Sequence, residues 1–172
     1  MSRSQSQLNR LNKLPEPEAT AEFLKCCGSQ TWAQRMSTSR PFANLEELCE
    51  RATDQWWSVE SADWLEAFRS HPKIGEKKAD ADVSNQSQSW SSQEQSGVAS
   101  AAASTLGELA QLNREYEEKF GYIFIVCATG KSSEEMLAIL KSRIGNSPND
   151  ELRVAAAEQA KITEIRLRKL IE

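Results

Sequence analysis

The chain has 172 residues, of which 39% are hydrophobic and 27% charged, and its formal net charge at pH 7 is −4. This length suits one domain with a single core, and the mild acidity disfavours a nucleic-acid or anionic-membrane partner. The longest apolar run, Tyr122 to Ala128, is far shorter than the ~20 residues of a membrane-spanning helix. We therefore expect a soluble protein without a membrane segment, by default in the cytoplasm.

The first 70 residues are predicted to be helical after a flexible start at residues 1–15. Ser29 is placed to accept hydrogen bonds from the free backbone amides at the start of one helix, and Asn44 from those of the next. A further helix should end before His71-Pro72, because a residue that precedes proline avoids the α region.

The second half begins with residues 76–91, whose Ser, Gln, Asn and Asp content predicts a mobile connector. A long helix is expected over residues 92–119, and Tyr122 to Ala128 should form a buried extended segment without a sheet partner. Ser132 opens another helix, and a last one covers residues 150–170. The prediction is an all-α chain: one compact helical bundle that spans all 172 residues, with one short isolated extended segment.

The cysteines indicate a reducing environment and no metal centre. Cys26 and Cys27 are adjacent and do not readily form a structural disulfide, and Cys49 and Cys127 belong to no C-x-x-C pair. His71 is the only histidine, which excludes a Cys/His zinc cluster. We expect reduced, mostly buried thiols and no metal.

His71 is the first candidate for proton transfer, because it is the only side chain here whose ordinary pKa lies near neutrality. It also follows the end of a predicted helix, where an imidazole can interact favourably with the last carbonyls without any catalytic role. The residues alone leave both interpretations open.

Ser91-x-x-Glu94 also allows two interpretations. The spacing matches a capping box, in which the two side chains accept from backbone amides at a helix start. A helix N-terminus also attracts anions, so Glu94 could instead lie beside a ligand.

Arg166 falls inside the apolar stripe of the last predicted helix. A guanidinium that faces a core needs a partner, because an unpaired buried charge is very costly. Either it forms an internal pair, for example with Glu158, or it anchors a carboxylate at a binding site.

Four segments, taken in order, resemble the OHCU decarboxylase family, and the resemblance extends from about Glu22 to Leu170. They are Phe68-x-x-His71-Pro72-Lys73-Ile74-Gly75, Ser91-x-x-Glu94-Gln95, Phe120-Gly121-Tyr122-Ile123-Phe124-Ile125-Val126 and Ile162-x-x-Ile165-Arg166-Leu167. The sequence around Cys26-Cys27-Gly28 is similar to the decarboxylase half of plant bifunctional allantoin synthases. The chain therefore resembles either a stand-alone relative or one domain of such a protein.

The resemblance implies an all-helical lyase that converts 2-oxo-4-hydroxy-4-carboxy-5-ureidoimidazoline (OHCU) to (S)-allantoin and CO2 in urate degradation. It implies that His71 is the catalytic histidine, described in the family as a proton donor, and that Glu94 is its acidic partner. The positions that match substrate contacts are Pro72, Ser91, Ser92, Gln93, Glu94, Gln95, Phe124, Ile125, Val126, Cys127, Ala128 and Arg166.

The same resemblance implies no cofactor, because the substrate ring carries its own electron sink. It also implies a homodimer and functional coupling to a transthyretin-like hydroxyisourate hydrolase. Eukaryotic relatives are often peroxisomal, but Leu170-Ile171-Glu172 does not match the C-terminal peroxisomal tripeptide.

Two other functions fit the residues. A Cys/His hydrolase would need one exposed, acidic cysteine near His71. A helical interaction module without chemistry would bind a protein through an exposed apolar groove.

Overall fold

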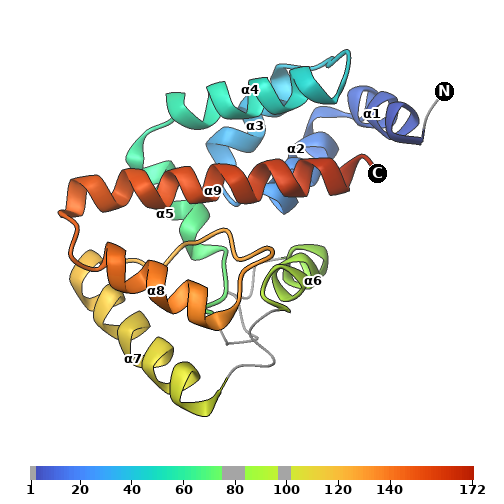
Figure 1. The fold of residues 1–172 in the computed structure, drawn as a ribbon. Helices are drawn as coiled ribbons and strands as arrows, with labels where there is room; N and C mark the ends of the chain where they lie inside the picture. Colours follow the sequence, from blue (N-terminus) through green and yellow to red (C-terminus); the bar gives the residue numbers. More distant parts are fainter. Residues whose placement is uncertain (1–2, 75–83, 97–101) are drawn as a thin grey trace. The chain divides into compact units, whose positions relative to one another are not determined.

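The computed structural model describes residues 3–74, 84–96 and 102–172, and within these ranges the chain forms nine α-helices and no strand (Figure 1). The predicted all-α class is confirmed. None of the helices in these ranges combines the length and apolar character needed to cross a bilayer. The helices are α1 (Arg3–Lys13), α2 (Glu16–Cys26), α3 (Gln30–Thr38), α4 (Leu45–Ser58), α5 (Ser61–Arg69), α6 (Asn85–Glu94), α7 (Ala103–Phe120), α8 (Ser133–Arg143) and α9 (Pro148–Leu170).

Contacts between Cα atoms divide the chain into two compact units. Unit 1 comprises Met1–Ala67 and Ala160–Glu172, and unit 2 comprises Phe68–Gln159. The boundaries fall inside α5 and α9, so each of these two helices contributes residues to both units. The single-domain organisation stays a prediction.

Unit 1 has an aromatic core held by helices that begin where the sequence predicted. Ser29 Oγ accepts from the Trp32 amide at 3.2 Å, and Asn44 Oδ1 accepts from the Glu47 amide at 2.9 Å. Both predicted N-caps are therefore confirmed. The buried rings of Phe23 and Trp32 meet edge to face with centroids 6.0 Å apart, where α2 packs on α3.

The expected flexible start at residues 1–15 is wrong, because α1 occupies most of it. Leu8 and Leu11, three residues apart, share one helical face and are buried. The Arg40 guanidinium binds free backbone carbonyls at the C-terminal end of α1, donating to those of Leu11 at 2.8 Å and Leu14 at 2.7 Å. The helix is not evident from the sequence because polar residues surround these two leucines, and because the guanidinium that binds the carbonyls at its end is 26 residues beyond Leu14.

Unit 2 is built around the contact of α7 with α8. Its buried core residues are Leu109, Tyr116, Phe124, Val126, Ala128, Met136, Leu137 and Leu140. Gly121 ends α7 with a φ of 81°, in the left-handed region that favours glycine. Ser132 and Glu135 form the predicted capping box of α8. Residues 123–128 between these helices belong to neither helix nor strand. Of the predicted buried segment, Phe124 to Ala128 are buried, whereas Tyr122 and Ile123 are only partly buried.

The predicted connector over 76–91 and long helix over 92–119 are wrong in their boundaries. Residues 85–91 belong to α6, which ends at Glu94, and α7 begins only at Ala103. The rest of the predicted connector, except Ser84, lies outside the described residues. Ser84 caps α6, since its Oγ accepts from the Ser87 amide at 3.2 Å. The buried positions of α6, Ser87, Trp90, Ser91 and Glu94, follow helical spacing, but three of them are polar, so hydrophobic periodicity could not reveal the helix.

Candidate functional site

His71 lies directly after α5, where its ring reaches a residue far along the chain. Its backbone amide donates to the Phe68 carbonyl at 3.2 Å, which closes the turn after the helix. Its Nε2 lies 2.6 Å from Oε1 of Gln159, a side chain of α9 that is fully buried. The ring itself is partly buried. The imidazole is therefore oriented by a buried amide, which favours the chemical interpretation over a simple helix-end contact.

The last turn of α6 carries the second candidate cluster. Ser91 and Glu94 are buried, Gln95 is partly buried, and Ser92 and Gln93 are exposed. The Gln95 amide donates to the Ser91 carbonyl at 3.1 Å, so this is the end of a helix. The predicted capping role of Ser91 and Glu94 is thus wrong.

The position of Glu94 is locally unfavourable for a carboxylate. The C-terminal end of a helix carries a partial negative charge, so an acidic residue there is disfavoured. Only 8% of the Glu94 surface is exposed, and burial of a charged group adds a desolvation cost. Residues that break a local preference in this way are often functional, and this favours the ligand interpretation of Glu94.

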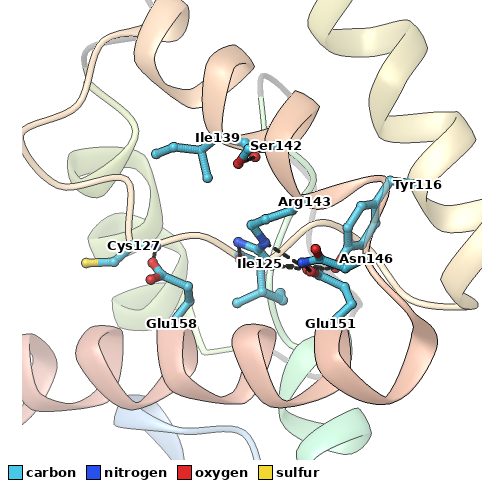
Figure 2. A network of polar contacts seen from close by, with 9 residues as sticks. All are labelled: Tyr116, Ile125, Cys127, Ile139, Ser142, Arg143, Asn146, Glu151 and Glu158. Carbon is cyan, nitrogen blue, oxygen red and sulfur yellow. Dashed lines mark hydrogen bonds and ion pairs between the residues drawn. The ribbon is translucent and has the colours of Figure 1, made fainter.

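The segment Phe124–Ala128 is held through its backbone (Figure 2). The Cys127 amide donates to Glu158 Oε2 at 2.7 Å, and Lys131 Nζ donates to the Cys127 carbonyl at 2.6 Å. The Ile125 carbonyl accepts from Arg143 Nη1 at 2.7 Å. Side chains from α8, α9 and the loop after the segment therefore fix its course. The ligand contacts predicted for this segment, and for Pro72 and residues 91–95, stay predictions.

A buried ionic network also holds this segment, because Arg143, which binds the Ile125 carbonyl, is paired with Glu151. Glu151, which is fully buried, accepts from Arg143 Nε at 2.8 Å, from the Tyr116 hydroxyl at 2.5 Å and from Asn146 Nδ2 at 2.9 Å (Figure 2). Burial, together with the hydrogen bond to Glu151, raises the pKa of Tyr116 well above its usual range, so the hydroxyl stays a donor. Each carboxylate oxygen has a partner, as a buried charge requires.

Glu94 acts electrostatically on the same segment. Burial raises the pKa of the Cys127 thiol, and the carboxylates of Glu158 and Glu94 raise it further, whereas Lys131 lowers it. Glu158 is adjacent to Gln159, which contacts His71. One turn of α9 therefore contacts both the His71 turn and the segment 124–128, and the end of α6 belongs to the same unit.

Arg166 lies in unit 1 and is 2% exposed, so the predicted inward orientation is confirmed. Its guanidinium lowers the pKa of both Cys26 and Cys27, which places it close to these thiols. Its predicted contact with substrate stays a prediction.

The thiols do not suit nucleophilic chemistry. Burial raises the pKa of Cys26 well above its usual range and that of Cys27 to about 12. The pKa values of Cys49 and Cys127 are also raised by burial. A nucleophilic cysteine needs a lowered pKa, so these values disfavour the Cys/His hydrolase. Within the described ranges, no group of three or more His, Cys, Asp or Glu residues could hold a metal ion.

The residues that orient the site were not predicted from the sequence: they are Lys131, Arg143, Glu151 and Gln159. For Glu158 the sequence suggests only a pair with Arg166. A signal did exist in the last helix, where Glu151 and Gln159 share the helical face of Ala155 and Ile162, and all four are buried. Polar side chains on an apolar face need partners inside the protein.

Comparisons with known proteins agree on one family. The family model described as OHCU decarboxylase matches residues 12–168. The uric acid degradation bifunctional protein TTL of Arabidopsis thaliana is 45% identical over 150 residues, which are 87% of this chain and 46% of that protein. The chain thus spans about half the length of that relative.

Two further relatives are similar in length to this chain. The 2-oxo-4-hydroxy-4-carboxy-5-ureidoimidazoline decarboxylase of Amia calva is 30% identical over 135 residues, 78% of this chain and 77% of that protein. A crystal structure of OHCU decarboxylase in the presence of (S)-allantoin superposes with a TM-score of 0.75 at 44% identity, covering 87% of this chain and 96% of that one.

Proposed function

Because this chain belongs to the OHCU decarboxylase family, we propose that it removes CO2 from OHCU and forms (S)-allantoin in urate degradation. The observation that carries the proposal is the 2.6 Å contact of His71 with the buried Gln159, in the unit that also holds Glu94 and the segment 124–128. An oriented imidazole in the same unit as a buried acidic residue and an ordered backbone segment suits proton transfer to a small polar substrate.

For this decarboxylation the protein needs mainly to position the substrate and to transfer a proton. The five-membered ring of the substrate has a conjugated C=N next to the carboxylated carbon, and this bond accepts the electron pair as CO2 leaves. The protein must hold the carboxylate out of the ring plane, neutralise the charge that develops in the ring, and protonate one face. His71 is the proton-transfer group, a role commonly worth ~10²–10⁴ in rate.

Glu94 and the segment 124–128 are the groups we propose to bind the ureide. The Glu94 carboxylate can accept from ureido N–H groups or from the substrate hydroxyl. Backbone amides and carbonyls of the segment can bind the remaining polar groups of the substrate. The Cys127 amide already donates to Glu158, so the donors for the substrate come from the other residues of the segment.

Circular dichroism during turnover tests the proposal directly. OHCU is generated from urate with urate oxidase and a hydroxyisourate hydrolase, the protein is added, and the optical signal of allantoin is followed. Spontaneous decay gives racemic product, so we expect a fast signal of one sign that scales with protein concentration. A racemic, protein-independent time course from folded material would contradict the activity.

The bifunctional relatives also support a proposal about partners. The Arabidopsis thaliana protein and a relative from a Bacillus strain are each named as a bifunctional protein of uric acid degradation, and we propose functional coupling to a hydroxyisourate hydrolase. The resemblance to the family further leads us to propose a homodimer, which light scattering after size-exclusion chromatography would detect as twice the 19.3 kDa chain mass.

A further inference from the structure

Gln159 is the side chain that orients the imidazole of His71. Its Oε1 lies 2.6 Å from His71 Nε2, although the two residues are 88 positions apart in the chain. Gln159 is fully buried, and its neighbours on the same helical face include the buried residues Ala155 and Ile162. A polar amide on such a face is costly unless it is hydrogen-bonded.

The contact has a definite consequence for the imidazole. An amide oxygen has no proton to donate, so a hydrogen bond between Oε1 and Nε2 requires the proton to lie on Nε2. In neutral imidazole one ring nitrogen carries the proton and the other carries the lone pair. The hydrogen bond therefore makes Nδ1 the basic nitrogen of neutral His71.

The position of Gln159 in the fold stabilises this tautomer of His71. It belongs to α9, a helix of 23 residues, and the preceding residue, Glu158, binds the Cys127 amide at 2.7 Å. Both side chains start from one rigid turn, so a single element aligns the histidine with the backbone segment. Because Gln159 is buried, bulk water does not compete for its amide.

We propose that Gln159 is a positioning residue that holds the proton of neutral His71 on Nε2, so that Nδ1 is the nitrogen that exchanges a proton with the substrate. The role of Nδ1 in proton exchange with the substrate rests on the proposed function. The position of the proton on Nε2 does not, because the tautomer is a property of the free protein. Gln159 acts through His71 and does not itself take part in the chemistry.

The full-length protein allows a direct spectroscopic test, because His71 is its only histidine. With ¹⁵N-labelled histidine, every ring signal belongs to this residue, and protonated and unprotonated nitrogens of neutral imidazole resonate far apart. At a pH where the ring is neutral, we expect the proton on Nε2 and a slowly exchanging Nε2–H signal. Detection of the proton on Nδ1 would overturn the inference.

Two substitutions separate positioning from general stability. Gln159→Met keeps the side-chain length but removes the acceptor, so the Nε2–H signal should be lost to exchange with water. We expect kcat to fall about tenfold, the equivalent of one hydrogen bond, with little change in KM. Gln159→Glu retains an acceptor and should restore the protected Nε2–H signal. Gln111→Met, on the exposed face of α7, is the matched control and should leave signal and rate unchanged.

The outcomes distinguish this inference from the proposed function. If Gln159→Met stays folded and keeps a protected Nε2–H signal, the positioning role is wrong even when the wild type decarboxylates OHCU. If the wild type shows the protected Nε2–H signal but no turnover, decarboxylation is wrong, while the tautomer assignment is supported. If Gln159→Met fails to fold, the wild-type tautomer still decides the inference.

Discussion

Unit 2 contains two hydrogen-bonded groups of polar side chains, and each includes a residue of α9. They differ in whether the buried residue of α9 is charged. In one, Glu151 is fully buried and accepts from Arg143, Tyr116 and Asn146. In the other, Gln159 offers a neutral amide oxygen to His71, whose ring is only partly buried. The first arrangement surrounds its charge with protein donors, and the second leaves a titratable ring with some exposure to solvent.

The difference shows how one helix can serve both structure and chemistry. A buried charge needs hydrogen-bonding or ionic partners within the protein. Once all its donors or acceptors are occupied by such partners, it is not available for proton transfer. A catalytic imidazole must instead be held firmly on one side and remain able to exchange a proton on the other. The two arrangements should therefore respond differently to mutation, the first in stability and the second in rate.

The largest effect is expected from His71→Ala. Loss of the proton-transfer group should reduce kcat for OHCU by ~10²–10⁴. The far-ultraviolet spectrum should change little, because the ring is only partly buried, whereas the thermal midpoint should fall modestly, because the buried Gln159 amide loses this hydrogen bond. Activity measured by circular dichroism and stability measured by thermal unfolding check both halves, and an unchanged rate would remove His71 from the mechanism.

The opposite response is expected from Glu151→Ala. This change leaves the buried Arg143 guanidinium without its carboxylate, which should cost about 3–5 kcal/mol in the free energy of unfolding. Urea unfolding measures this loss, and activity per folded molecule should change less than stability.

Glu164→Ala is a matched control on the same helix. Glu164 pairs with Arg168, but both side chains are about half exposed, at 49% and 51%. An exposed pair of this kind contributes at most about 1 kcal/mol. Equal losses of stability in the Glu164 and Glu151 variants would contradict the structural role of the buried network.

Glu94→Gln should resemble the His71 variant more than the Glu151 variant. The substitution keeps the shape but removes the charge, so we expect a rate loss on the order of 10²-fold with a small change in stability. Glu118→Gln makes the same chemical change on the exposed face of α7 and serves as the control. A large loss of stability with a normal rate per folded molecule would assign Glu94 to structure instead.

A further effect concerns the buried thiols of unit 1 and is confined to alkaline pH. The pKa of Cys27 is raised to about 12 by burial, so the folded state keeps a proton that the unfolded chain loses above its ordinary value. Stability is then full below a pH of about 8.5 and falls as pH rises towards the folded-state pKa, by about 2 kcal/mol per thiol at pH 10. Urea unfolding at about pH 7.5 and about pH 10 measures the fall. Cys27→Ala should show a smaller fall than the wild type, and an identical one would contradict the assignment.

Local sequence chemistry determined much of the fold. The caps at Ser29, Asn44 and Ser132 involve residues only three positions apart, so their side chains and the following amides form a unit that needs no tertiary context. The burial of Phe124 to Ala128 followed in the same way from a continuous apolar run. Periodicity also placed Arg166 on the inner face of its helix, where it is buried.

The tertiary structure alone decided how the site is oriented. The buried face of α6 is formed by Ser87, Trp90, Ser91 and Glu94, whose helical spacing is hidden by their polarity. The contact of His71 with Gln159 joins residues 88 positions apart, and no local preference links an imidazole to a distant amide. Short-range hydrogen bonds are determined by neighbouring residues, whereas the partner of a buried polar group depends on which elements pack together.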